Sequence, residues 1–209
     1  MRKEFVEAVE KFQNEFGKAL AGEKIQKLAG YYEIVQKENA LLHLVAPCSA
    51  GEFAVRHVLE SLTVLEFLPE RARFADVGTG AGLPAVPCLI AREDLQGFLI
   101  ESKLKKSEFL RRALQELDLE GRARVINRQF EEIERPDVSF VLCRALDKFT
   151  RKLPKLLKWT ADANFLFFGG NSLREELEKN KIEFEEKLMP QSEQRFLFVG
   201  KKTAADKRG

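Results

Sequence analysis

The sequence predicts an α/β fold in which a seven-stranded, Rossmann-like sheet is wound with helices and preceded by a helical extension. After Phe74, short apolar runs alternate with longer helical segments, which is typical of a parallel sheet covered on both faces. The last two apolar runs are joined by a loop too short for a helix, so they form an antiparallel hairpin. A glycine-rich turn over residues 78–82 follows the first run, where such sheets bind nucleotides.

The first seventy residues form amphipathic helices. Two sets of apolar residues recur at helical spacing: Phe5, Val9, Phe12 and Phe16, and then Ile25, Leu28, Tyr32 and Val35. A third apolar segment covers residues 53–68 and ends before Pro69. We therefore expect residues 1–70 to be a helical extension packed on a core domain at 71–202, followed by a flexible basic tail at 203–209.

The core domain is expected to alternate strands and helices in order. Short runs rich in Val, Ile, Leu and Phe predict strands at 74–77, 97–100, 124–126, 138–143, 164–168, 184–188 and 195–199. Longer amphipathic segments predict helices near 84–91, 103–117, 148–159 and 172–179. The first five strands would then be parallel and the last pair antiparallel.

Charge and cysteine content restrict the function classes. Lys and Arg number 35 against 33 Asp and Glu, so the net charge of +2 neither requires nor excludes a nucleic-acid partner. Three cysteines without a CxxC pair, and only two histidines, support neither a disulfide framework nor a metal site. The N-terminus lacks the apolar core of a signal peptide. We expect a reduced, cytoplasmic, soluble monomer with no membrane partner.

The glycine turn and two acidic residues indicate an adenosine-bearing cofactor. Gly78, Gly80 and Gly82 alternate, and Asp76 stands two residues before the first of them. This spacing departs from the dinucleotide pattern G-x-G-x-x-G and matches the acid-x-G-x-G-x-G pattern of S-adenosylmethionine sites. Glu101 ends the second expected strand, 19 residues after Gly82, where a carboxylate can accept both ribose hydroxyls. The alternatives are a plain strand-to-helix turn and a solvated strand end.

These residues and their neighbours resemble the GidB/RsmG family of bacterial small-subunit (16S) ribosomal RNA guanine methyltransferases. The resemblance runs from about Tyr32 to Lys201. It is carried by VRHVLES at 55–61, DVGTGAGLP at 76–84 with Pro87, Glu101-Ser102 followed by Lys105-Lys106 and Phe109-Leu110, Cys143-Arg144-Ala145, and Arg195. It implies a class I S-adenosylmethionine-dependent methyltransferase that methylates guanine nitrogen 7, with ribosomal RNA or the small ribosomal subunit as partner.

The same resemblance implies roles for individual residues. Gly78 and Leu83 would line the cofactor, Phe130 and Glu131 would flank its adenine, Glu101 would take the ribose, and Arg144 would close the site as cofactor or catalytic residue. The chain departs from the family pattern at His43-Leu44-Val45, Glu60, Gln129 and Gly169, mainly on the substrate side.

Basic residues suggest where a substrate would bind. Arg56 and His57 are the resemblance's candidates, although a polar pair on a helix face is the simpler interpretation. A stripe of cations at helical spacing comprises Lys148, Arg151, Lys152, Lys155 and Lys158, and the preceding helix adds Lys103, Lys105, Lys106, Arg111 and Arg112. Both sets suit a phosphate backbone or, alternatively, a solvated surface.

The expected chemistry needs positioning more than acid–base help. Guanine nitrogen 7 carries an in-plane lone pair and no proton, so no base is required before attack. Cys143 ends the fourth expected strand, and we expect a small buried hydrophobe there rather than a nucleophile. Two further hypotheses are a small-molecule methyltransferase, with the first three helices as an apolar lid, and a cofactor-binding module that has lost catalysis.

Overall fold

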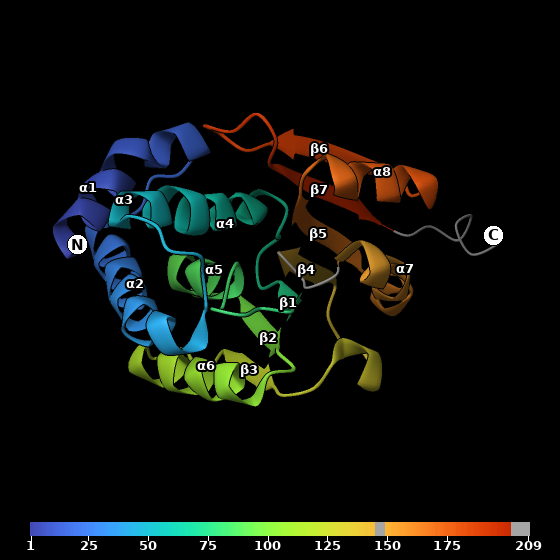
Figure 1. Cartoon of the computed structure of the whole chain (residues 1–209), viewed down its shortest axis with the longest axis horizontal. Helices are drawn as coiled ribbons and strands as arrows, with labels where there is room; N and C mark the ends of the chain where they lie inside the picture. Colours follow the sequence, from blue (N-terminus) through green and yellow to red (C-terminus); the bar gives the residue numbers. More distant parts are fainter. Residues whose placement is uncertain (145–148, 202–209) are drawn as a thin grey trace.

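The computed structural model describes residues 1–144 and 149–201, and within them one mixed sheet of seven strands organises the chain (Figure 1). The strands are β1 (Arg73–Val77), β2 (Gln96–Ile100), β3 (Ala123–Ile126), β4 (Phe140–Arg144), β5 (Asn164–Gly169), β6 (Phe184–Leu188) and β7 (Phe196–Lys201). Their order is β3-β2-β1-β4-β5-β7-β6, and β7 runs antiparallel to both of its neighbours. The predicted seven-stranded, Rossmann-like sheet with an antiparallel hairpin is confirmed.

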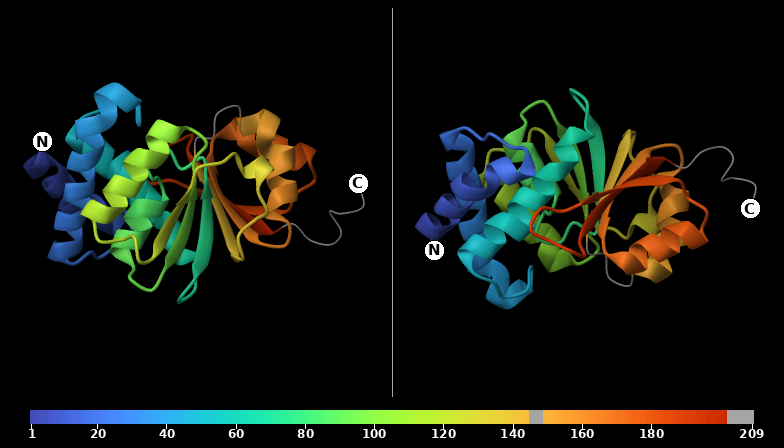
Figure 2. Two further views of the ribbon diagram at one scale, coloured as in Figure 1. Left: turned by 90° about the horizontal axis from the view of Figure 1, so that it is seen from below. Right: turned by 90° about the horizontal axis from the view of Figure 1, so that it is seen from above.

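Helices cover both faces of this sheet. The crossover helices are α5 (Ala85–Ala91), α6 (Leu104–Glu116), α7 (Phe149–Thr160) and α8 (Asn171–Lys179). Their ends lie within two residues of the predicted ones, and the predicted start of α7 at 148 lies outside the described residues. Figure 2 shows the sheet between two layers, with α6 and the N-terminal helices on one side and α7 and α8 on the other. A short 3-10 turn, Phe130–Glu132, lies between β3 and β4.

The N-terminal helices pack onto one face through aromatic rings. They are α1 (Arg2–Phe12), α2 (Gly22–Leu42) and a third helical stretch built from α3 (Ala50–Glu52), a π-helical segment (Phe53–Leu59) and α4 (Glu60–Leu62). Phe5 stacks on Tyr32 with ring centroids 5.2 Å apart, and Phe53 lies 5.1 Å from Tyr32. The third helix is less regular than predicted, because a 3-10 turn replaces it at Thr63–Glu66.

Side chains that alternate along each strand divide the core into two clusters. In β1, Phe74 belongs to the cluster that includes α1, α2, α5 and α6, whereas Ala75 and Val77 belong to the cluster that includes α7 and α8. The larger cluster is one connected set of buried side chains that includes both Phe5 of α1 and Leu197 of β7. The N-terminal helices therefore share one hydrophobic core with the sheet. This packing fixes α2 and the third helical stretch beside the carboxyl ends of β1 and β4.

Candidate active site

The glycine turn leaves β1 in a conformation that side chains disfavour. Gly78, Gly80 and Gly82 have φ values of 71°, 58° and 97°, all in the left-handed region. A Cβ atom on Gly82 would also lie 2.6 Å from Cγ2 of Val86 in α5. Gly82 thus allows close packing of the turn on the helix, while Gly78 and Gly80 face the open side of the turn.

Glu101 is fixed against this turn from the end of β2. One carboxylate oxygen accepts a hydrogen bond of 3.1 Å from the backbone N–H of Gly80, and the other accepts one of 2.8 Å from the N–H of Lys103. The side chain is nearly buried, at 7% exposure. Hydrogen bonds to backbone amides hold the carboxylate in one orientation, as a site for polar ligand groups requires.

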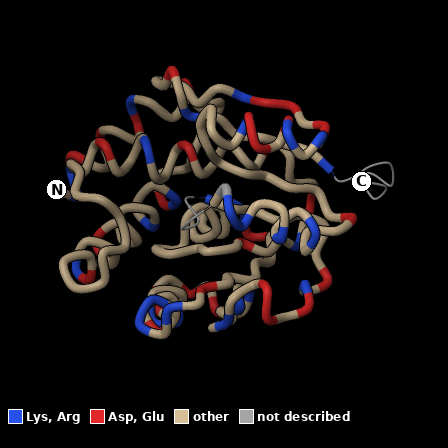
Figure 3. Tube along the Cα trace, turned by 45° about the vertical axis from the view of Figure 1, so that its right-hand side comes forward, with Lys and Arg blue, Asp and Glu red and all other residues tan. Residues whose placement is uncertain are grey.

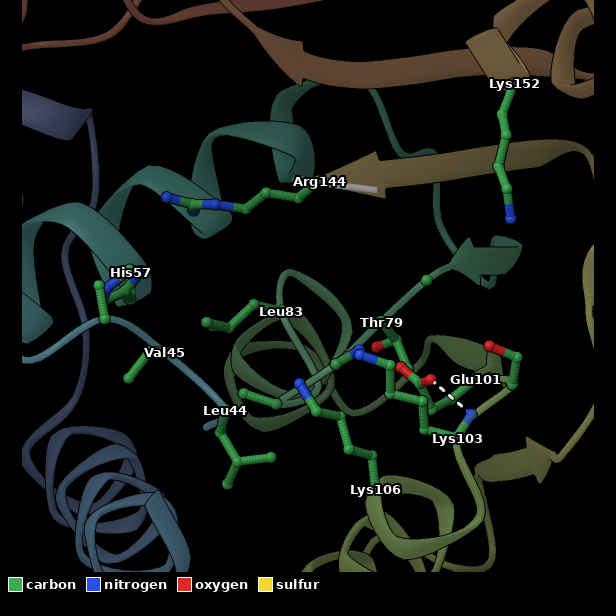
Figure 4. A pocket seen from close by; sticks show the side chains of 15 residues that line it. Leu44, Val45, His57, Thr79, Leu83, Glu101, Lys103, Lys106, Arg144 and Lys152 are labelled. Atoms are coloured by element: carbon green, nitrogen blue, oxygen red, sulfur yellow. Dashed lines mark hydrogen bonds between the residues drawn. The ribbon is translucent and has the colours of Figure 1, made fainter. Parts of the chain in front are cut away.

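A cavity of about 550 Å³ opens above the turn (Figure 4). Its lining comes from five parts of the fold: Leu44, Val45 and Ala46 after α2, His57 of the third helical stretch, Gly78, Thr79, Gly80, Ala81 and Leu83 of the turn, Glu101, Ser102, Lys103 and Lys106 at β2 and α6, and Arg144 and Lys152 at β4 and α7. Figure 4 shows Arg144 and Lys152 entering from the side opposite Lys106. Lysine and arginine outnumber the single carboxylate in this lining.

A smaller hollow of about 20 Å³ adjoins the cavity and shares Gly78, Ser102 and Lys152 with it. Phe130 and Glu131, for which the family resemblance implies a place beside an adenine, line this hollow. The Lys152 ammonium lies 5.8 Å from the centre of the Phe130 ring and 3.6 Å from the Glu131 carboxylate. Lys152 therefore stands at the boundary between the two spaces.

Arg144 is held by a buried acidic partner. Its Nη2 lies 3.0 Å from Oε2 of Glu60, which is only 1% exposed, and Nε of Arg195 lies 2.8 Å from Oε1 of the same carboxylate. Arg144 also donates to the Ser61 hydroxyl at 3.3 Å and to the Arg56 carbonyl at 2.5 Å. The ion pair is buried rather than superficial, so the guanidinium is held in one orientation.

His57 is kept neutral by its surroundings. Burial, followed by the charges of Arg144 and Arg56, lowers the pKa of its imidazole to about 4. Its Nδ1 is buried without a hydrogen-bond partner, and its ring packs 5.1 Å from Phe53. At neutral pH the cavity wall therefore carries an uncharged imidazole beside a fixed arginine.

Asp76 lies beneath the turn and does not line the cavity. Its Oδ2 accepts hydrogen bonds from the Thr79 hydroxyl at 2.6 Å and from the N–H of Ala85 at 3.3 Å, while Oδ1 is buried without a partner. Complete burial raises the pKa of this carboxyl to about 7. Asp76 thus shapes the turn from behind.

The structure brings most of the predicted residues together and leaves others aside. Gly78, Gly80, Leu83, Glu101, His57 and Arg144 share the cavity, and Phe130 and Glu131 share the adjoining hollow. Neither space is lined by Asp76, Gly82, Arg56 or Arg151 within the described part of the chain. Arg56 is exposed and paired with Glu52, and Arg151 is exposed on α7. Lys148 lies outside the described residues.

Some site residues carry little signal in the sequence. Leu44, Val45 and Glu60 stand out in the sequence only as departures from the family pattern. The structure shows that Leu44 and Val45 line the cavity and that Glu60 is buried. Lys106 and Lys152 stand in basic runs whose spacing does not tell which members turn inward. They differ from their exposed neighbours only in lying on the face of the helix that points into the cavity.

The described ranges contain neither a bilayer-spanning helix nor a metal-binding cluster. No helix there has both the length and the apolar character needed to cross a bilayer. No group of three or more His, Cys, Asp or Glu side chains within 1–144 and 149–201 is arranged to hold a metal ion.

Comparison with known proteins identifies relatives over most of the chain. Residues 24–203 match the GidB family, described as rRNA small subunit methyltransferase G. The chain is 35% identical over 139 residues to the ribosomal RNA small subunit methyltransferase G of Dichelobacter nodosus, covering 66% of this chain and 64% of that protein. It is 30% identical over 165 residues to the protein of the same name from Corynebacterium diphtheriae, covering 77% of this chain and 74% of the relative. The first alignment thus spans just under two thirds of the relative's length.

Solved structures show the same fold at greater distance. The B. subtilis tRNA methyltransferase TrmK superposes with a TM-score of 0.54 at 17% identity, over 70% of this chain and 67% of that one. At this identity the likeness concerns the fold alone, that of Rossmann-like class I methyltransferases. The match over residues 24–203, together with the relatives at 30% identity and above, shows that the chain belongs to the GidB family of rRNA small subunit methyltransferase G proteins.

Proposed function

We propose that this protein transfers a methyl group from S-adenosylmethionine to nitrogen 7 of a guanine in small-subunit ribosomal RNA, in the cytoplasm. The observation that carries the proposal is the Glu101 carboxylate, held against the left-handed glycine turn at the edge of a cavity of about 550 Å³. In a chain of the GidB family, this arrangement provides what an adenosine-bearing cofactor needs.

The residues present fit this cofactor. The cavity volume lies within the range of about 300–1,000 Å³ usual for small-molecule sites. Glu101 would accept the ribose hydroxyls, Gly78 and Leu83 would contact the cofactor beside the turn, and Phe130 and Glu131 would flank the adenine at the adjoining hollow. Asp76 and Gly82 would act indirectly, by fixing the turn.

The chain's own contribution to the reaction is orientation and electrostatics. When bound, S-adenosylmethionine supplies a methyl group activated by a sulfonium. The guanine N7 lone pair needs no deprotonation, so the protein has to align the base and exclude water. Arg144 is suited to holding a guanine edge or the cofactor's carboxylate, because its partners Glu60 and Ser61 fix it in place. Neutral His57 adds an uncharged polar group to the same wall.

The charge of the cavity favours a polyanionic substrate. Lys103, Lys106, Arg144 and Lys152 line it, although acidic and basic residues are mixed over the chain as a whole (Figure 3). Local cations of this kind contact phosphates. We include Arg56, His57, Lys148 and Arg151 as candidates for RNA contacts. The four cations in this lining distinguish the cavity from the closed apolar pocket expected of a small-molecule methyltransferase.

The test is methyl transfer from radiolabelled S-adenosylmethionine to small ribosomal subunits from cells that lack this gene. We expect label in the RNA, at a guanine whose N7 methylation permits chain cleavage after reduction and aniline treatment. Subunits from cells carrying the gene serve as the control and should accept no label. Cofactor binding without transfer would support the noncatalytic module, and absence of cofactor binding would reject the proposal.

A further inference from the structure

The N-terminal extension contacts the glycine turn through one buried hydroxyl. Tyr31, in the middle of α2, is fully buried, and its hydroxyl donates a hydrogen bond of 3.0 Å to the carbonyl oxygen of Ala81. Ala81 stands between Gly80 and Gly82 and lines the cavity. A side chain from the first seventy residues thus reaches the backbone of the turn.

This bond belongs to a set that fixes the turn from three directions. Asp76 accepts from Thr79 beneath the turn, Glu101 accepts from Gly80 at its β2 side, and Tyr31 donates to Ala81 from α2. Ala81 is only 2% exposed, so its carbonyl would be left without a partner if the hydroxyl were removed. The left-handed glycines on either side offer little resistance to a change of backbone angles.

The same helix also holds the opposite wall of the cavity. Asn39, in the last turn of α2, accepts hydrogen bonds of 2.9 Å at its side-chain oxygen from the N–H groups of Leu44 and Val45, which follow the helix. Leu44 and Val45 line the cavity across from the turn. One helix therefore sets the spacing between the turn and the wall that faces it.

We propose that Tyr31 is a positioning residue of the cofactor site, which holds the Ala81 peptide and thereby makes the N-terminal extension a working part of cofactor binding. The proposal rests on the function proposed above. Burial raises the pKa of the Tyr31 hydroxyl far above its ordinary value, so the group remains a donor at every working pH. The prediction differs from a packing role, since only the hydroxyl, and not the ring, carries it.

Tyr32 provides a matched control in the same helix. Its ring is also buried and stacks on Phe5, but its hydroxyl makes no hydrogen bond within the described residues. Tyr31→Phe should raise the Kd of S-adenosylmethionine about tenfold by calorimetry, the equivalent of one hydrogen bond. The KM for small subunits at saturating cofactor should stay unchanged. Tyr32→Phe should leave both values as in the wild type.

Four outcomes of this comparison are decisive. Weakened cofactor binding in Tyr31→Phe alone, with an unchanged KM for subunits, supports the proposal. Wild-type cofactor affinity in a folded Tyr31→Phe protein overturns it, and so does equal weakening in both variants, which would indicate helix packing. Failure of the wild-type protein to bind S-adenosylmethionine would instead reject the proposed function, and this inference with it.

A second measurement needs no disruptive substitution. The chain has two tyrosines, so 3-fluorotyrosine labelling gives one fluorine signal from each, and the Tyr32→Phe spectrum assigns them. On addition of S-adenosylmethionine to the wild-type protein, we expect the Tyr31 signal to shift and the Tyr32 signal to stay. A Tyr31 signal unmoved at saturating cofactor would overturn the proposal even if Tyr31→Phe failed to fold.

Discussion

Arg144 and Glu60 form an ion pair with a donor–acceptor distance of 3.0 Å, although the carboxylate is almost completely buried. Arg195 binds the second carboxylate oxygen, so one acidic residue of α4 joins the end of β4 to the residue before β7. The arginine that the sequence singles out is thus fixed by a partner that the sequence does not reveal. Removing Glu60 leaves two arginines without their shared carboxylate, whereas removing Arg144 leaves Glu60 paired with Arg195 alone.

Arg144→Ala should abolish methyl transfer to small subunits and lower the free energy of unfolding by about 2 kcal/mol, because Glu60 loses one charged hydrogen bond but keeps Arg195. Arg144→Lys should restore little, since an ammonium cannot reproduce the planar fork. Arg174→Ala, which removes an ion pair with Glu186 on the hairpin, is the control and should retain full transfer. Near-normal transfer by a folded Arg144→Ala protein would remove Arg144 from the site.

Glu101→Ala should weaken S-adenosylmethionine binding by about 1.5–3 kcal/mol, the value of hydrogen bonds to a charged acceptor. Part of the loss comes from the N–H groups of Gly80 and Lys103, which lose their acceptor. Glu101→Gln keeps one acceptor oxygen, so its affinity for S-adenosylmethionine should lie between those of the wild type and Glu101→Ala. Calorimetry measures all three proteins, and unchanged affinity in folded Glu101→Ala would contradict the ribose role.

Asp76 should make stability depend on pH in the direction opposite to most carboxylates. Its pKa is raised to about 7 in the folded protein, so the folded state retains a proton that the unfolded state releases near pH 4. Stability should therefore fall as pH rises from about 4 to about 7. Urea unfolding at pH 5 and pH 8 should show this fall in wild type relative to Asp76→Asn. The difference between the two proteins isolates Asp76 from other groups, and an equal difference at both pH values would refute the prediction.

His57 should remain neutral well into the acid range, since burial and the neighbouring arginines lower its pKa to about 4. The chain has two histidines, so a ring-proton titration by NMR resolves both, and His57→Gln assigns the signals. By linkage, the unfolded chain takes up this proton first, so His57 costs stability as pH falls from about 6.5 to about 4. A His57 midpoint near 6.5 would show that the cavity wall becomes charged in mildly acidic solution.

Cys143→Ala should leave methyl transfer unchanged, because attack by a ring nitrogen needs no covalent enzyme intermediate. Cys143 is fully buried in the core cluster that faces α7 and α8. The loss of a buried sulfur should cost about 1 kcal/mol of stability. Transfer assays and urea unfolding check the two statements separately. Trapping of a protein–RNA adduct through this thiol would contradict the first.

The sequence predicts features that depend on local pattern. Alternating strands and helices fix the sheet, and the turn with Glu101 follows from spacing along two consecutive strands. Features that depend on contacts between residues far apart in the sequence cannot be predicted from local pattern. The sequence marks Glu60 only as a departure from the family pattern, and its burial between Arg144 and Arg195 depends on residues from other elements. Tyr31 is not among the periodic apolar residues that predict its helix, and its partner is a backbone carbonyl 50 residues away.

Asp76 illustrates a different limit. Its place before the glycines suggests contact with a ligand. Its side chain instead lies beneath the glycine turn and accepts hydrogen bonds from Thr79 and Ala85. Within a strand, adjacent side chains point to opposite faces, so a motif position does not tell whether a residue contacts or supports. The basic stripe has the same ambiguity, because Lys152 turns inward and Arg151 outward from one helix.

The position of Glu60 also bears on how the newly made chain becomes active. Its two arginine partners follow 84 and 135 residues later in the sequence. During synthesis, Glu60 is therefore made long before either of its arginine partners. The second partner, Arg195, is made just before the final strand. In refolding experiments, recovery of methyl transfer should lag behind the recovery of helical circular dichroism and coincide with docking of the C-terminal hairpin. Completion of the sheet would then be the step that completes the candidate active site.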